Sequence, residues 1–176
     1  MNGGLKSGLV LLILGIISGT LLAVVNSFTA PKIEEIEQNV VYESLESFYD
    51  LDNYLVTEEN IESNGLDTIY ILTNKSDNQI GALIYLVSAA GYNGDVTMLI
   101  AINSDYSVEG YTIVSQKENP PINDDFVHHD YNVNDITNLN DFDAIAGATY
   151  TSTAIRDCFI IISDRVVSDF GGGLND

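Results

Sequence analysis

The run Thr68-Ile69-Tyr70-Ile71-Leu72-Thr73, the turn Asn74-Lys75-Ser76-Asp77 and the run Ile80–Val87 decide the fold of this chain. Short runs of β-branched and aromatic residues, separated by turn residues, are typical of β-hairpins. Two further runs of this kind follow after polar turns, at Val96–Ile102 and Val108–Val114. The pattern predicts a meandering, mainly antiparallel sheet.

Helical spacing flanks the predicted sheet on both sides. Upstream, apolar residues between Ile33 and Tyr49 recur every three or four positions, and glutamates fill much of the remaining face. Downstream, apolar residues from Ala154 to Phe170 show the same period, and the glycines that start at Gly171 end the helix. The polar segment Lys117–Asn140 predicts a loop, with room for a short helix. The expected fold class is therefore α+β.

The N-terminal segment predicts a membrane anchor. Residues from Ser7 to Ala30 carry no charge, and about 20 apolar residues span a bilayer core. A cleaved signal peptide is the alternative, but its apolar core is usually about 7–15 residues long. Pro31 also follows Ala30 directly, where a cleavage site would fit badly. A permanent helix is therefore favoured, and Ala30–Pro31 is expected to end it or to open the next helix.

The basic residues around the anchor give it an orientation. Lys6 and the N-terminal amine lie before the apolar segment and Lys32 follows it among glutamates, which predicts a cytoplasmic N-terminus. The expected organisation is a cytoplasmic tip and transmembrane helix over 1–31, a helical stalk over 32–50, an extracytoplasmic domain over 51–170 and a flexible tail over 171–176. Gly15 and Gly19 form a G-x-x-x-G pair, which allows another membrane helix to approach closely.

The charge of the chain limits its partners. It has 26 acidic and 6 basic side chains, for a formal net charge of −20, and every acidic residue follows Pro31. Such a chain repels phosphate backbones, which argues against nucleic acid as a partner. Solvation explains an acidic surface, and attraction of a basic partner is the alternative. The single cysteine, Cys158, excludes an intrachain disulfide and lies on the apolar stripe of the last helix, as a core residue would.

The segment Asp143–Thr151, with the sequence D-A-I-A-G-A-T-Y-T, carries the strongest chemical signal. Gly147 and Ala148 lack bulk, so a backbone or a planar ligand can approach them closely. The last helix is expected to begin near Thr149–Ser152, where free backbone N–H groups and the helix dipole favour a phosphate. A hydroxyl placed there could hold a phosphoryl group covalently. A plain N-cap is the alternative, because Ser and Thr are favoured at helix starts.

Three segments of the chain together match the pattern of a known family. Thr29–Glu35 is similar to T-x-P-x-I-E-E-N, Gly91–Val96 to G-Y-G-G-x-I, and Asp143–Thr149 to D-x-x-[S/T/A]-G-A-T. With the N-terminal membrane helix, their order resembles that of the FMN-binding subunit of the Rnf and Nqr membrane electron-transfer complexes. This protein is called G in Rnf and C in Nqr, and the resemblance covers nearly the whole chain.

The chain departs from the family pattern at two places. Ala146 stands where Ser or Thr is more usual, which removes a hydroxyl but keeps the small volume. After the fourth strand, the family pattern H-x-E-T-P-G-L-G is replaced by Gln116–Asn123, in which Glu118 and Pro120 match. Residues of this segment help to frame the flavin in the family, so the environment of the isoalloxazine ring is expected to differ.

The resemblance implies a flavin electron relay. Thr149 would carry FMN through a phosphoester bond, and Asp143 would be the acid that a separate flavin transferase recognises. The other expected cofactor-binding residues are Gly147, Ala148, Tyr150, Thr151, Glu118 and Tyr92, of which the two tyrosines could stack on the flavin ring. The chain would be a redox subunit, not an enzyme on its own. Its complex would couple electron flow from reduced ferredoxin or NADH to sodium or proton transport.

Two other functions stay open at this point: a membrane-anchored flavin carrier that serves extracellular acceptors, and a cofactor-free, tethered interaction domain. Other chemistries are disfavoured by the residues themselves. Adjacent side chains such as His128 and His129 point in opposite directions on an extended segment, so they rarely share one metal ion. The aspartate pairs at 50/52 and 124/125 do not fit the twelve-residue calcium loop. A hydrolase nucleophile elbow, G-x-S-x-G, is not found in the sequence.

Overall fold

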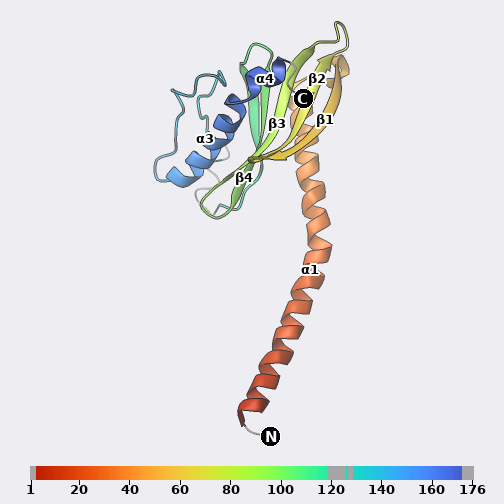
Figure 1. Ribbon diagram of the computed structural model, residues 1–176, viewed down its shortest axis with the longest axis vertical. Coiled ribbons are helices and arrows are strands. Elements are labelled where there is room, and N and C mark those ends of the chain that lie inside the picture. Colours follow the sequence, from red (N-terminus) through yellow and green to blue (C-terminus); the bar gives the residue numbers. More distant parts are fainter. Residues whose placement is uncertain (1–2, 119–125, 127–128, 172–176) are drawn as a thin grey trace. The chain divides into compact units, whose positions relative to one another are not determined.

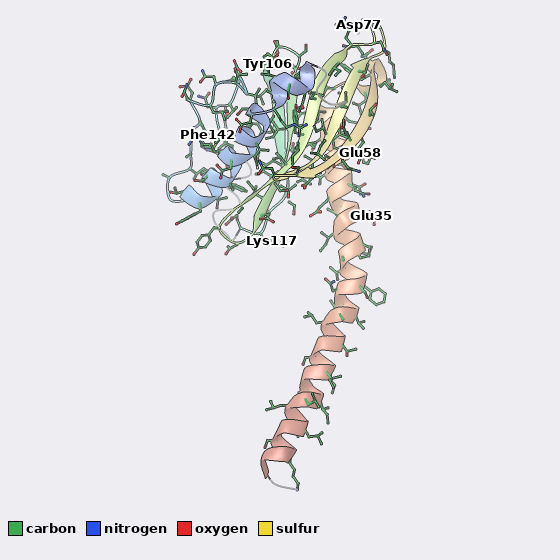
Figure 2. All side chains as sticks on the ribbon, in the orientation of Figure 1. Glu35, Glu58, Asp77, Tyr106, Lys117 and Phe142 are labelled. Carbon is green, nitrogen blue, oxygen red and sulfur yellow. The ribbon has the colours of Figure 1, made fainter. Side chains whose placement is uncertain are left out.

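The computed structural model describes residues 3–118, 126 and 129–171, and the chain divides into two compact units, residues 1–39 and 40–176. The first element, α1 (Gly3–Phe48), begins in the first unit and ends in the second (Figure 1). Large apolar side chains between Leu9 and Phe28 project around the whole circumference of α1 (Figure 2). A helix that is apolar all round suits a lipid environment. By length and composition α1 can cross a membrane, with a mean hydropathy of 2.7 in its most apolar window.

The expected helix boundary at Ala30–Pro31 was wrong, because α1 continues through Pro31. Proline has no N–H, so the carbonyl of Ser27 loses its usual helical donor. The neighbouring hydroxyls of Ser27 and Thr29 donate to the carbonyls of Val24 and Val25 at 2.8 and 2.9 Å. Polar side chains that bond within their own helix are tolerated at membrane depth.

The second unit is built on a five-stranded sheet with the order β1-β2-β3-β4-β5, and every neighbouring pair is antiparallel. Antiparallel neighbours need only short turns between them, which is what the polar turns of the sequence supply. The predicted antiparallel meander is therefore confirmed. The strands are β1 (Tyr54–Ser63), β2 (Leu66–Asn74), β3 (Ile80–Ala90), β4 (Asp95–Asn103) and β5 (Val108–Ser115), and a 3-10 helix, η1 (Leu51–Asn53), precedes them.

The first strand, β1, was not predicted. It contains three glutamates among its ten residues, and its Leu55 and Val56 are exposed. It lies at the edge of the sheet and pairs only with β2, and natural edge strands are often charged. The turn into β2 is Asn64–Gly65, with φ angles of 53° and 83°. Asn-Gly is the preferred pair for a two-residue hairpin turn, so the sequence did contain a signal for this strand.

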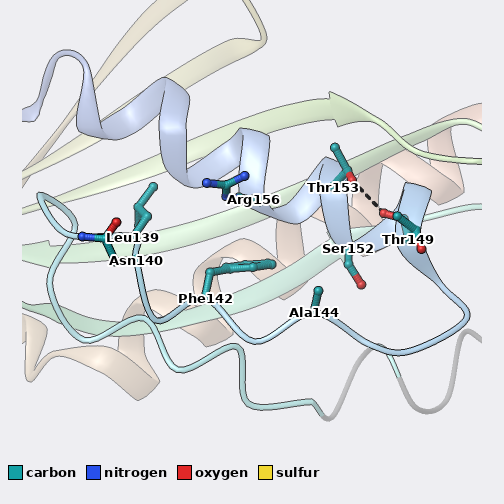
Figure 3. Close-up of a pocket in the computed structure, with 8 residues that line it drawn as sticks. All are labelled: Leu139, Asn140, Phe142, Ala144, Thr149, Ser152, Thr153 and Arg156. Atoms are coloured by element: carbon teal, nitrogen blue, oxygen red, sulfur yellow. Dashed lines mark hydrogen bonds between the residues drawn. The ribbon is translucent and has the colours of Figure 1, made fainter.

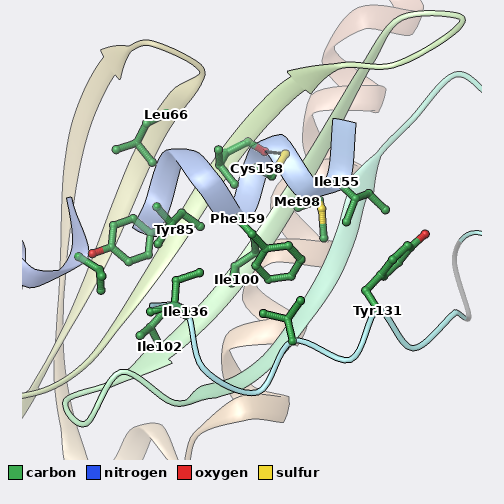
Figure 4. Close-up of a cluster of buried hydrophobic side chains, with 14 of the residues drawn as sticks. Leu66, Tyr85, Met98, Ile100, Ile102, Tyr131, Ile136, Ile155, Cys158 and Phe159 are labelled. Atoms are coloured by element: carbon green, nitrogen blue, oxygen red, sulfur yellow. Dashed lines mark hydrogen bonds between the residues drawn. The ribbon is translucent and has the colours of Figure 1, made fainter. Parts of the chain in front are cut away.

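Successive side chains of a strand point to opposite faces, so this sheet has apolar side chains on both faces. A helix packs against each face and buries them. On one face, Tyr85, Met98 and Ile100 belong to a buried cluster with Ile155 and Phe159 of α3 (Thr149–Ser163) (Figure 4). The opposite face supplies a second cluster that includes residues near the C-terminal end of α1. The buried members of this second cluster are Val41, Leu45, Tyr70, Leu72, Ala82, Ile84, Leu99 and Ala101. The end of α1 is thus part of the core of the second unit.

The C-terminal helical pattern forms two helices, where one was predicted. After α3, Asp164 and Arg165 interrupt the helix, and α4 (Val166–Phe170) follows. The carboxylate of Asp169 is buried, and it accepts hydrogen bonds from Arg165 Nε at 2.7 Å and Nη2 at 3.0 Å. The hydroxyl of Tyr85 donates to the same carboxylate at 3.0 Å. The buried carboxylate of Asp169 thus has three hydrogen-bond donors, and one of these bonds connects α4 to Tyr85 of β3.

We expect the domain to lose stability at alkaline pH. Burial raises the pKa of the Cys158 thiol to about 12 and that of Tyr70 to about 12, and it also raises the pKa of Tyr85 and Tyr131. A raised folded pKa contributes stability that is complete below the unfolded value and is lost as pH rises toward the folded value. The unfolded values are 9.0 for the thiol and 10.0 for the phenols. The urea midpoint should therefore hold up to about pH 9 and then fall; a midpoint that stays constant to about pH 11 would contradict this.

Candidate functional site

The N-terminal end of α3 has no side-chain cap in the part of the chain that the structure describes. Its N-cap residue is Ala148, and Thr149 is the first helical residue. The N–H of Ser152 donates to the carbonyl of Ala148 at 2.9 Å. Within residues 3–118, 126 and 129–171, the N–H groups of Thr149, Tyr150 and Thr151 have no backbone or side-chain acceptor. Thr149 is thus not the plain N-cap of this helix, and the free N–H groups together with the helix dipole favour an anion here.

Thr149 is exposed and lines a cavity of about 250 Å³ between α3 and the segment that precedes it (Figure 3). The other lining residues are Leu139, Asn140, Phe142, Ala144, Ser152, Thr153 and Arg156. Hydrogen bonds fix both walls: Ser152 Oγ accepts from the N–H of Ile145 at 3.1 Å, and Thr153 Oγ1 donates to the carbonyl of Thr149 at 2.7 Å. Gly147 makes the turn into the helix with a φ of 88°, a conformation that favours glycine.

The turn between β3 and β4 reaches the start of α3 through the ring contact of Tyr92 with Tyr150. Glu118 is buried, and its Oε1 accepts from the N–H of Tyr92 at 2.8 Å and from that of Asn93 at 3.5 Å. A Cβ on Gly91 would lie 2.7 Å from the same Oε1 and 2.8 Å from the carbonyl of Gly94, so this position requires glycine. Glu118 therefore holds the conformation of the turn that presents Tyr92.

The rings of Tyr92 and Tyr150 lie together at the surface. Their centroids are 6.2 Å apart with an interplanar angle of 43°, although one residue follows β3 and the other opens α3. They are 69% and 73% exposed, so neither ring is used to fill the core. Exposed aromatic faces next to Thr149 offer a stacking surface for a planar ligand. Long-range folding thus brings together two tyrosines that the sequence could only name separately.

Asp143 lies on the same loop but faces a different neighbour. Its carboxylate is 3.4 Å from His129 Nε2, and its own carbonyl is 3.1 Å from the same nitrogen. The His129 ring packs edge-on against Tyr131, with centroids 4.8 Å apart. Asp143 and His129 line a wider depression of about 650 Å³, together with Asp130, Asn132, Asn140, Asp141 and Phe142. The side chain of Asp143 is 65% exposed and so is accessible to another protein.

Metal ligation has no support in the described residues. In that part of the chain, His, Cys, Asp and Glu form no group of three or more that could hold an ion. Asp124, Asp125 and His128, and Pro120 of the family pattern, lie outside the described residues.

Thr151, one of the predicted cofactor residues, is 2% exposed, and its hydroxyl has no hydrogen-bond partner within residues 3–118, 126 and 129–171.

Of the residues that line the Thr149 cavity, sequence reasoning named only Thr149 as cofactor-binding; it missed Arg156 and Phe142 among the others, and also the contact between His129 and Asp143. Arg156 follows Thr149 by seven positions, and residues at i, i+4 and i+7 share one helix face. Helical periodicity therefore contained the signal for Arg156. Phe142 and His129 are placed by loop contacts, for which the sequence has no comparable period.

Comparison with known proteins shows what the segment that contains this site is similar to. Residues 91–159 match the family model described as FMN-binding domain. The chain is 30% identical over 130 residues to the G subunit of the ion-translocating oxidoreductase complex of Shewanella piezotolerans, which covers 68% of this chain and 61% of that protein. It is 26% identical over 128 residues to the protein of the same name from Erwinia tasmaniensis, over 68% of this chain and 60% of that protein. The chain thus spans about three fifths of the length of these curated relatives.

The residues at the start of α3 fit FMN. The free N–H groups suit a phosphate, the paired tyrosine rings suit an isoalloxazine, and the buried Thr151 hydroxyl retains an unused hydrogen-bonding group. The matched interval, 91–159, contains both the Tyr92 turn and Thr149. Residues 91–159 thus match the model of an FMN-binding domain, and over 68% of its length the chain is similar to G subunits of ion-translocating oxidoreductase complexes.

Proposed function

We propose that Thr149 carries FMN through a phosphoester bond and that the chain is an electron-relay subunit of an Rnf- or Nqr-like ion-translocating complex. The observation that carries this proposal is the exposed Thr149 at an uncapped helix start, beside N–H groups that have no acceptor among the described residues. In the attachment, the Thr149 hydroxyl loses its proton and its Oγ bonds to the phosphorus of a flavin dinucleotide donor. The bond from that phosphorus to the departing nucleotide breaks, so the chain gains FMN less one water.

The neighbouring residues have distinct tasks in this proposal. Tyr92 and Tyr150 offer aromatic faces to the flavin ring, and Glu118 holds the turn that carries Tyr92. Gly147 and Ala148 shape the entry into α3 and leave the phosphate access to the N–H groups of the first turn. When bound, FMN supplies reversible electron uptake, and the protein supplies its position and electrostatic surroundings.

Asp143 is proposed as the acid that a flavin transferase recognises during maturation. Its side chain is mostly exposed and six residues before Thr149, so a second protein can reach both. The contact with His129 restrains the loop that presents it. A restrained loop costs less conformational entropy when it is bound.

The apolar helix suggests where the relay works. We infer that residues 1–31 anchor the chain in the cell membrane with a cytoplasmic N-terminus, that 32–50 form a stalk whose last part packs on the sheet, and that 51–170 act outside the cytoplasm. Residues 172–176 of the expected tail lie outside the described residues. The exposed apolar side chains of α1 from Leu9 to Phe28 support the anchor. A covalent bond suits a relay outside the cytoplasm, because a freely dissociating flavin would be lost there. The relatives are named as subunits of a complex, which supports other membrane subunits as the partners.

The proposal is tested on the full-length protein, produced in a host that exports it and supplies a flavin transferase. After denaturing electrophoresis, the band should fluoresce under blue or ultraviolet light, because a phosphoester bond survives denaturation. A dark band from this host would contradict the attachment. A dark band from production without the transferase is the matched control. Copurification with other membrane subunits separates a complex subunit from a stand-alone flavin carrier.

A further inference from the structure

The cavity beside Thr149 is lined by one positively charged side chain, Arg156, that has no part in the attachment of FMN itself. Arg156 lies on α3 seven residues after Thr149, on the helix face that also carries Thr153. It extends on the side of α3 that faces the Leu139–Ala144 segment (Figure 3). Side chains of a helix lean toward its N-terminus, and Arg156 and Thr149 line the same cavity.

Arg156 has no partner in the described part of the chain. The ion pairs found there are His129–Asp143 and Arg165–Asp169, and no hydrogen bond there involves Arg156. The other arginine, Arg165, is bound to Asp169 through both Nε and Nη2. Arg156 is therefore available to a ligand of the cavity, whereas Arg165 is already committed to the core.

The surroundings of the cavity are acidic, so a cation there would favour the binding of an anion. The chain has a net charge of −20, and Asp141 and Asp143 are exposed on the loop next to the cavity. A phosphodiester adds one further negative charge at Thr149. Helix N–H groups favour that charge within the first turn, and a cation in the same cavity would offset its repulsion by the loop carboxylates.

We propose that Arg156 is a positioning residue that binds the phosphate of FMN attached to Thr149. A guanidinium presents a planar fork of N–H donors that matches two phosphate oxygens at once. The N–H groups of the first turn of α3 and the guanidinium of Arg156 would bind the same phosphate and hold it in one place in the cavity. A fixed phosphate also fixes the first atoms of the ribityl group, which connects the phosphate to the flavin ring. The inference rests on the proposed attachment at Thr149.

The test compares flavin-loaded and flavin-free forms of the full-length protein in detergent micelles. Loaded chains come from a host with the transferase and unloaded chains from one without it, and intact mass verifies the state of each. The variants are Arg156→Gln, Arg156→Lys and the control Lys75→Gln. Lys75 lies in the β2–β3 turn, at the end of β3 opposite the Tyr92 turn, and its Nζ donates to the carbonyl of Asp52 at 2.8 Å. Urea unfolding then gives the folding equilibrium constant of each form.

In the loaded form, Arg156→Gln should lower the folding equilibrium constant about tenfold, because hydrogen bonds between charged groups are lost. In the unloaded form it should change this constant by less than about twofold, as a surface substitution does. Arg156→Lys should fall between the two, since it keeps the charge but loses the fork. Lys75→Gln should affect loaded and unloaded forms equally.

Equal effects of Arg156→Gln on both forms would overturn the inference, because they would indicate a purely structural role or none. A wild-type chain that gains no flavin mass in the presence of the transferase would instead overturn the attachment at Thr149. An Arg156→Gln chain that folds normally but is not loaded, while Arg156→Lys is loaded, supports the phosphate contact, because the donor presents the same phosphate.

Discussion

Replacement of Asp169 by alanine should lower the free energy of unfolding by about 3 kcal/mol, because it leaves Arg165 and the Tyr85 hydroxyl without their shared acceptor. Loss of one partner of a buried ion pair typically costs about 3–5 kcal/mol. The side chain of Arg165 is 30% exposed and can turn toward water, which places the expected loss at the lower end. Urea or thermal unfolding of the full-length protein in micelles measures it.

Two variants sharpen this measurement. Tyr85→Phe removes a single hydrogen bond and keeps the ion pair, so it should cost about 1 kcal/mol. Asp164→Ala removes an exposed acid five positions before Asp169 and should change little. If Asp169→Ala were no worse than Asp164→Ala, the ionic cluster would have no part in joining α4 to the sheet.

Replacement of Thr149 by valine should abolish the covalent flavin while the domain stays folded. The substitution removes the hydroxyl that would bond to phosphorus and keeps the shape of the side chain. Thr149 is exposed, so the expected change in stability is within about 0.5 kcal/mol. Thr153→Val is the matched control: it removes a hydroxyl one turn later on the same face, and it should retain the flavin.

Intact mass and in-gel fluorescence of both variants, produced with the transferase, decide this prediction. Flavin mass retained on Thr149→Val would place the bond elsewhere. Loss of flavin from Thr153→Val with normal loading of Thr149→Val would move the attachment to the neighbouring hydroxyl. Circular dichroism of each variant establishes that the domain is folded.

Much of the fold could be predicted because its signals are local. The runs that became β2 to β5 are dense in β-branched and aromatic residues and are separated by turn residues, so pattern and propensity agree. β1 was missed because an edge strand is half solvated and its glutamates hide the alternation. The break between α3 and α4 was missed because the helical period continues across it, and the contact of Asp169 with Tyr85, 84 residues away, is not visible in a local pattern. The helix continues through Pro31 although local rules favour a boundary there.

Some residues of the candidate site could also be predicted from local sequence, whereas others are brought together only by long-range contacts. A short motif was sufficient to name Thr149, Gly147 and Ala148, because a helix start and a tight turn depend on neighbours in sequence. The pairing of Tyr92 with Tyr150 and the support of Tyr92 by Glu118 join residues from distant segments. Such contacts depend on the completed sheet, so no local pattern could specify them.

The peptide that contains Thr149 offers the most direct test of the central claim. Cleavage after Lys117 and Arg156 releases Glu118–Arg156, which contains Thr149. When the full-length protein is isolated from membranes of a host with the transferase, this peptide should carry FMN less one water, and fragmentation should place the added mass on Thr149. An unmodified Glu118–Arg156 peptide throughout the sample would contradict the account.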